Sequence, residues 1–185
     1  MPAKKVALCF IINYNHILHK ETIWRRWIAE NKDIVNVYFY YKNYDQIRSP
    51  WIRRHCLPSN CIYHTTYTNI IPAYFSLIHY AYHDDVDNQW FCFLTETCCP
   101  IVPSHKFRAL FEANSHCSIL RWKKPWWNIH LVRRANLHSL PNHLQLGHDP
   151  WFVLTRVHAY QCMAFAKEQQ SLTKYICDGG IANES

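Results

Sequence analysis

The residues best suited to ligand chemistry follow directly after apolar runs of the chain. The stretch Trp90–Ile101, WFCFLTETCCPI, passes from large apolar residues straight into Glu96 and Cys98 without a glycine. Asn13 and Tyr14 follow another apolar run in the same way. In open α/β sheets ligands bind beyond the carboxyl ends of the strands, so a site is expected at these positions. From spacing alone, Glu96 either holds a ribose, a sugar hydroxyl or a metal, or caps the turn while the thiols pack as small apolar groups.

Strand patterns and helix patterns alternate along the chain, and these elements must position the polar residues. Short apolar or β-branched runs predict strands, whereas apolar residues at helical spacing predict helices. Strands are expected at residues 5–12, 35–41, 60–63, 90–94, 118–122 and 151–154, and helices at 17–28, 69–83, 103–112 and 155–169. Asn69 is a candidate N-cap for the second helix, with Pro72 in its first turn. The alternation predicts a single α/β domain over residues 1–185, built as three layers around a mostly parallel sheet.

The composition narrows the class of protein and of partner. Only 3 of the 185 residues are glycine, and neither a G-x-G-x-x-G nor a P-loop motif occurs. The formal net charge of +7 favours anionic partners. No segment reaches the roughly 18 consecutive apolar residues of a membrane span. Residues 5–12 are predicted to form a core strand rather than a signal peptide, and the nine cysteines lack the spacing of a disulfide framework. We therefore expect free thiols and a cytoplasmic location.

Four stretches of the chain resemble one known family. FLTETCCPI, residues 93–101, is similar to the L-S-E-S-C-x-P-L signature of plant and microbial proteins of the core-2/I-branching N-acetylglucosaminyltransferase-like family. GHDPWFVLTR, residues 147–156, resembles that family's aromatic pair ahead of a Leu-x-Arg. YICDGGIANES, residues 175–185, resembles the segment with its Asp-Glu motif, and KVALCFII stands where the family begins its sheet. The resemblance implies a GT-A-like, Rossmann-like fold in a C-terminally shortened version.

The resemblance also implies a reaction and a set of site residues. The family consists of inverting glycosyltransferases that move a sugar, typically N-acetylglucosamine, glucuronic acid or xylose, from a UDP-sugar to a glycan hydroxyl. Glu184 matches the general base, and a shifted match gives Asp178 that role. The donor and acceptor positions are Asn13 and Tyr14 near the nucleotide, Glu96 and Thr97 on the donor side, and Trp126, Trp127 and Trp151 on the acceptor side. The match does not assign the cations that neutralise the diphosphate. The candidates for that role are Arg156, Lys174, Arg133, Arg134 and the cluster of Arg121, Lys123 and Lys124. The resemblance implies a reaction that requires no metal, with Mn²⁺ as the alternative. Many GT-A enzymes hold a metal with an Asp-x-Asp motif, and no such motif stands at the end of a predicted strand.

Other readings of the same residues stay open. One alternative is a non-catalytic module of the same fold that binds nucleotide sugars or carbohydrates. Residues 119–134 interleave cations with tryptophans, which also suits a groove for single-stranded nucleic acid. His79 and His83 lie four residues apart on a predicted helix, and Cys56, Cys61 and His64 cluster, so a structural zinc is a further alternative.

Overall fold

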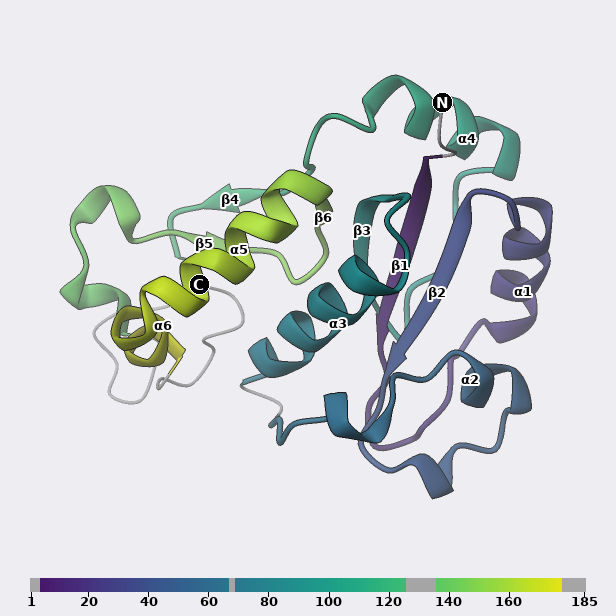
Figure 1. Cartoon of the computed structure of the whole chain (residues 1–185), viewed down its shortest axis with the longest axis horizontal. Helices are drawn as coiled ribbons and strands as arrows, with labels where there is room; N and C mark the ends of the chain where they lie inside the picture. The colour runs from purple at the N-terminus through teal and green to yellow at the C-terminus, as the bar shows by residue number, and fades with distance from the viewer. Residues whose placement is uncertain (1–3, 67–68, 126–135, 178–185) are drawn as a thin grey trace.

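A four-stranded, mostly parallel sheet forms the centre of the protein. The structure is a computed structural model that describes residues 4–66, 69–125 and 136–177. The strand order is β2 (Val35–Tyr40), β1 (Lys5–Ile11), β3 (Asn88–Thr95) and β6 (Val153–Thr155). The first three strands are parallel, whereas β6 runs antiparallel to β3 (Figure 1). Within the described residues a separate short ribbon pairs β4 (Trp122–Lys123) with β5 (Gly147–His148).

Helices cover both faces of this sheet. The helices are α1 (Glu21–Glu30), α2 (Pro50–Arg54), α3 (Ile71–Asp84), α4 (Ser104–Asn114), α5 (Arg156–Glu168) and α6 (Gln170–Cys177). Short 3-10 turns lie at η1 (Tyr44–Gln46), η2 (Ser59–Cys61), η3 (Asn136–Ser139) and η4 (Asn142–Leu144). Residues of α1, α2 and α4 pack on one face of the sheet, and residues of α3 and α5 pack on the other. The architecture is therefore a three-layer α/β arrangement compatible with a Rossmann-like fold.

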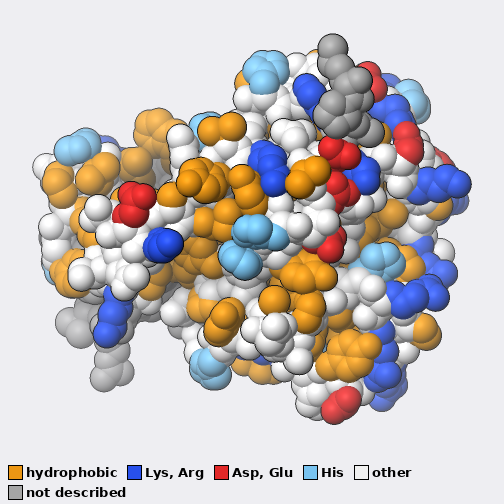
Figure 2. All heavy atoms as spheres, viewed as in Figure 1, with side chains coloured by type: hydrophobic (Ala, Val, Ile, Leu, Met, Phe, Trp, Pro, Cys, Tyr) orange, Lys and Arg blue, Asp and Glu red, His pale blue; other side chains and the backbone are white. Residues whose placement is uncertain are grey.

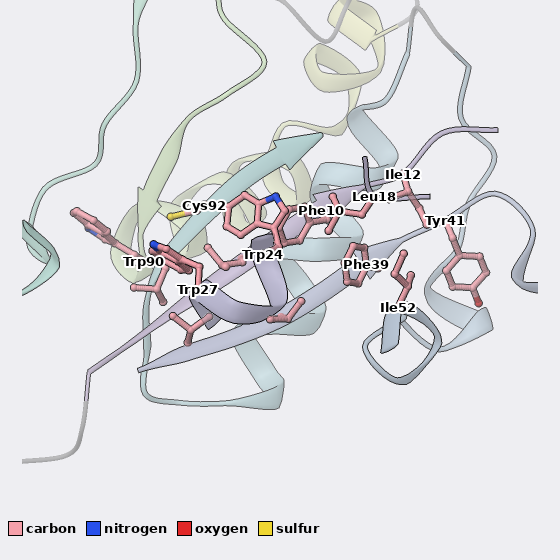
Figure 3. Packing of buried hydrophobic residues seen from close by; sticks show 14 of the residues in the cluster. Phe10, Ile12, Leu18, Trp24, Trp27, Phe39, Tyr41, Ile52, Trp90 and Cys92 are labelled. Carbon is pink, nitrogen blue, oxygen red and sulfur yellow. The ribbon is translucent and has the colours of Figure 1, made fainter. Parts of the chain in front are cut away.

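Aromatic side chains dominate the core on the α1 face. Phe10 of β1 stacks on Phe39 of β2 with 4.9 Å between the ring centroids and meets the edge of Trp24 at 5.0 Å (Figure 3). On the opposite face, Phe91 and Phe93 of β3 pack against α3. Because β1 is buried on both sides, its sequence is a continuous apolar run rather than an alternating one.

The structure confirms the α/β class and most of the predicted elements, and corrects four details. Of the predicted strand at 118–122 only Trp122 lies in a strand, the short β4 outside the main sheet, while Ile119 forms an isolated bridge with Val153. Residues 60–63 do not form a strand, since η2 follows Pro58, whose φ of −56° and ψ of 148° direct the chain into a 3-10 turn. Asn69 is not the N-cap of α3; Ile70 occupies that position, and the Asn69 amide donates to the carbonyl of Cys177 instead. The predicted strand at 151–154 begins later and is antiparallel to β3. In the described part of the chain, no helix is both long and apolar enough to cross a membrane.

Candidate functional site

Asn13 and Glu96 meet at the carboxyl edge of the sheet. β1 and β3 are parallel neighbours in which Ile11 pairs with Thr95, so the residues that follow each strand emerge at the same edge. The side-chain amide of Asn13 donates to Glu96 Oε1 across 2.5 Å. The backbone N–H of His19 donates to the carbonyl of Glu96 at 3.0 Å. The structure thus brings together two predicted site residues that lie 83 positions apart in sequence.

The turn that carries Glu96 is closed by its own cysteine. The Cys98 N–H donates to the carbonyl of Thr95 at 3.1 Å, and the Thr95 N–H donates to Cys98 Sγ at 3.3 Å. The hydroxyls of Thr95 and Thr97 lie 3.1 Å apart, with Thr97 exposed at the tip. The carbonyl of Cys98 accepts from the indole N–H of Trp24 at 2.9 Å. Cys98 is therefore a structural residue, and it leaves the Glu96 carboxylate at the surface beside Asn13.

The loop after β1 is fixed by backbone geometry and a buried histidine. Asn13 Oδ1 accepts from the backbone N–H of Asn15 at 2.9 Å, which forms a tight Asx turn. His16 adopts a left-handed φ of 52° and is buried. Its Nε2 accepts from the backbone N–H of Asn43 at 2.9 Å, so the neutral ring carries its proton on Nδ1. This bond ties the loop after β1 to the loop after β2, and 67% of the surface of the nearby Tyr14 is exposed.

Lys42 is a candidate ligand-binding residue that sequence analysis missed. It follows β2 with one intervening residue, and it therefore lies on the same edge as Asn13 and Glu96. Its ammonium donates to the carbonyl of Thr65 and, at 2.5 Å, to Thr65 Oγ1. The ammonium also lies 5.4 Å from the centre of the Tyr14 ring. Burial lowers the pKa of Lys42. Asn13 was predicted as a site residue because it follows the end of a strand, and Lys42 follows the end of β2 in the same way.

An apolar pocket of about 280 Å³ lies on the α1 face of the sheet and reaches its carboxyl end. Trp151 lines it together with Trp24 and Trp27 of α1 and with Leu94, which stands two residues before Glu96. Trp151 is 53% exposed, and it stands two residues before Val153, the first residue of the antiparallel strand β6, which pairs with Cys92 of β3. The pocket offers aromatic surface to a ring-shaped group held near Glu96.

Arg156 lies at the opposite edge of the sheet. Its guanidinium donates to the carbonyls of Tyr82 at 2.9 Å and of Asp85 and Asn88 at 3.3 Å. It also stacks on the Tyr82 ring, 3.7 Å from the centroid. Asn88 is the first residue of β3, whereas Glu96 follows its last residue. Arg156 therefore anchors the α3–β3 connection and is not close to the Asn13–Glu96 pair.

The described residues do not bring together the ligands expected for a metal. No group of three or more His, Cys, Asp and Glu side chains comes together within residues 4–66, 69–125 and 136–177. His79 and His83 are exposed neighbours on α3, with 4.5 Å between ring centroids. Cys56 donates to the carbonyl of Ile52, and burial raises the pKa of its thiol to about 12.

Several predicted site residues lie outside the described part of the chain. These are both candidates for the general base, Glu184 and Asp178, and two acceptor-side tryptophans, Trp126 and Trp127. The Lys and Arg side chains are unevenly spread over the surface, and Figure 2 shows them gathered over α1 and α2.

The edge formed by Asn13, Tyr14, Lys42 and Glu96 combines groups of complementary chemistry. The carboxylate of Glu96 accepts hydrogen bonds from hydroxyls, the ammonium of Lys42 attracts anions, and the Tyr14 face and the neighbouring pocket accommodate rings. We call these four residues the carboxyl-edge site. Comparisons with protein-family models and with curated protein sequences find no match for this chain.

Proposed function

We propose that the chain is an inverting, GT-A-like glycosyltransferase that binds a UDP-sugar at the carboxyl-edge site and transfers the sugar to a glycan hydroxyl. The observation that carries the proposal is the contact between Asn13 and Glu96, at the edge where open α/β sheets bind ligands. The sequence FLTETCCPI, which includes Glu96, is also the part of the chain that most resembles the family signature.

The proposal gives each residue a role, and only the general base comes from outside the described residues. Glu96 accepts from a hydroxyl of the donor, and Asn13 holds the carboxylate in place by its 2.5 Å hydrogen bond. Lys42 supplies positive charge for the diphosphate, on which negative charge develops as the sugar leaves. Trp151 provides an aromatic face for the acceptor ring. Glu184, or Asp178 in the alternative match, removes the proton from the acceptor hydroxyl, which then attacks the anomeric carbon in line.

Binding and turnover can be measured separately. Isothermal titration calorimetry with UDP, UDP-N-acetylglucosamine, UDP-glucuronic acid and UDP-xylose, with and without Mn²⁺, is expected to show binding of UDP and of one sugar nucleotide. Incubation of that sugar nucleotide with glycan acceptors should then release UDP. Glu184→Gln should abolish release and keep UDP affinity, with Asp178→Asn tested beside it. UDP binding without turnover would identify a non-catalytic module of the same fold, and failure to bind any of these ligands would contradict the proposal.

One observation favours a second candidate function, the binding of single-stranded nucleic acid. Trp122 on β4 is 63% exposed, and Arg121, Lys123 and Lys124 flank it in sequence. An exposed indole among cations suits the stacking of a base beside its phosphates. Affinity for oligo-dT that falls steeply with salt, and that Trp122→Ala weakens by about tenfold, would support this candidate. Unchanged affinity in Trp122→Ala would exclude this surface.

A further inference from the structure

We propose that the outer edge of β2 binds an extended acidic segment of a partner protein, which adds a strand to the sheet. This inference is independent of the proposed function, because it concerns the side of the sheet and not its carboxyl edge. β2 is the outermost strand in the order β2-β1-β3-β6 (Figure 1). A strand in that position offers the backbone groups of alternate residues to a further strand.

The hydrogen bonds of β2 identify the backbone groups that point outward. The carbonyl of Tyr40 accepts from the N–H of Ile12 at 3.0 Å, so the even-numbered positions of β2 face β1. Backbone groups alternate in direction along a strand. The N–H and C=O groups of Val35, Val37 and Phe39 therefore point away from β1.

Another segment of the chain already pairs with part of this edge. The N–H of Phe39 donates to the carbonyl of His55 at 2.8 Å, and its carbonyl accepts from the N–H of Leu57 at 2.9 Å, in a parallel bridge. Among the described residues, no backbone group pairs with the outward groups of Val35 and Val37. The sequence of β2, VNVYFY, contains neither a charged residue nor a proline, which commonly protect a strand edge. Two N–H and two C=O groups thus continue a pairing that the fold already uses.

A groove of about 460 Å³ lies beside these backbone groups. Val35 and Val37 line it, together with Ile28 of α1, Lys32 and Tyr80 of α3. Because α1 and α3 cover opposite faces of the sheet, the groove follows the sheet edge between them. The side chains of an added strand would point alternately to the α1 side and to the α3 side.

The charges along the groove favour an acidic occupant. Lys32 precedes β2 and Arg54 ends α2, which packs on the same face of the sheet as α1. Both side chains are exposed, and neither forms an ion pair within the part of the chain that the structure describes. Asp84 lies on the α3 side, where its carboxylate accepts from the Tyr38 hydroxyl at 2.8 Å. We therefore expect carboxylates at the alternate positions that face Lys32 and Arg54, with uncharged residues between them.

The same charges disfavour a second copy of this chain as the occupant. Lys and Arg side chains gather over α1 and α2 (Figure 2), and the chain carries a formal net charge of +7. Pairing two copies edge to edge would bring these like charges together, which is unfavourable. A partner with carboxylates has the opposite charge and gains from the contact.

Two capped pentapeptides of opposite charge, acetyl-ETVTE-amide and acetyl-KTVTK-amide, test the occupant by calorimetry. The acidic peptide should bind, more weakly as salt is added, and the basic peptide should not. The double variant Lys32→Glu/Arg54→Glu should weaken the acidic peptide by about tenfold or more and should bind the basic peptide instead. Lys106→Glu/Lys167→Glu, at exposed cations of α4 and α5, makes the same change in net charge away from the groove and should bind as the wild type does.

Methylation of the peptide backbone separates strand pairing from charge attraction. Successive N–H groups of an extended strand point to opposite sides, so a peptide methylated on its valine nitrogen and one methylated on both threonine nitrogens lose donors on opposite edges. Only one of the two should bind about tenfold more weakly than the parent peptide, because only one edge faces β2. The sensitive pattern also gives the direction of the added strand.

Each outcome decides for or against the proposal. Binding of the acidic peptide, exchange for the basic peptide in the charge-reversed variant and sensitivity to one methylation pattern together support it. Equal affinities of the two methylated peptides, or undiminished binding of the acidic peptide to the charge-reversed variant, would overturn it. If the acidic peptide does not bind the wild-type chain, the proposal is wrong, and a dimer in light scattering would then assign the edge to a second copy.

Discussion

The indole N–H of Trp24 lies 2.9 Å from the carbonyl oxygen of Cys98, so the core of the protein holds the turn that carries Glu96. Trp27, one turn along α1, donates in the same way to the carbonyl of Val102 at 2.8 Å. Both indoles are buried against β1 and β3. The loop after β3 is thus attached to α1 at two points, which positions the carboxylate without a glycine in the turn.

Trp24→Phe is expected to destabilise the protein by about 1–3 kcal/mol, because it removes this hydrogen bond and leaves a small cavity. Urea unfolding followed by circular dichroism measures the loss. Hydrogen exchange should also accelerate at the Cys98 amide, whose acceptor lies within the same turn. Trp122→Phe, at an exposed tryptophan, is the control. Equal stability of both variants would show that the core does not restrain this turn.

Glu96→Gln tests the charge at the carboxyl edge without removing its hydrogen bond. The glutamine oxygen can still accept from Asn13, so the melting temperature should change by no more than about 2 °C. Affinity for the sugar nucleotide should fall by about tenfold, since a hydrogen bond to a charged acceptor is stronger than one to an amide. Glu112→Gln, at an exposed carboxylate of α4, should bind as the wild type does. Full affinity in Glu96→Gln would remove this carboxylate from the site.

Arg156→Met should lower stability and leave ligand affinity intact. The substitution removes hydrogen bonds to three carbonyls and the contact with the Tyr82 ring, at a cost of about 2–3 kcal/mol. Urea unfolding and UDP titration on the same preparation measure the two effects. A stable variant with weakened UDP binding would instead return Arg156 to the ligand site, as one of the candidate cations for the diphosphate.

The sequence predicted most elements of the fold, but it assigned Arg156 to the ligand site, from which the structure shows it to be remote. The apolar runs of β1, β2 and β3 and the helical spacing of apolar residues in α3 and α5 predicted those elements, because buried positions are occupied by apolar residues. The direction of a strand, parallel or antiparallel, has no such effect on its residues. A parallel strand at 151–154 would bring the residues that follow it, Thr155 and Arg156, to the carboxyl edge, but β6 is antiparallel and places Arg156 at the other end. The same reversal brings Trp151 to the end of β3, beside the site.

The ion pair of Asp33 with Arg108 predicts a dependence of stability on pH. Arg108 Nη1 and Nη2 donate to Asp33 Oδ2 and Oδ1, each at 2.8 Å, and this pair links the connection after α1 to α4. The hydrogen bonds lower the pKa of Asp33 from its ordinary value of 3.8 to about 2. A carboxylate whose pKa is lower in the folded state stabilises the fold above its unfolded pKa and loses that contribution as the pH falls.

Arg108→Met should therefore be less stable than the wild type at pH 7, and the difference should shrink as the pH falls from about 4 to about 2. The difference should also shrink with added salt, since both partners are reached by solvent. Urea unfolding at a series of pH values, with Asp33→Asn and the double variant, isolates the pair from other carboxylates. In the double-mutant cycle the coupling between the two positions should vanish once Asp33 is protonated. A coupling of the same size at pH 2 as at pH 7 would mean that packing of the Arg108 side chain, and not its charge, joins the two segments.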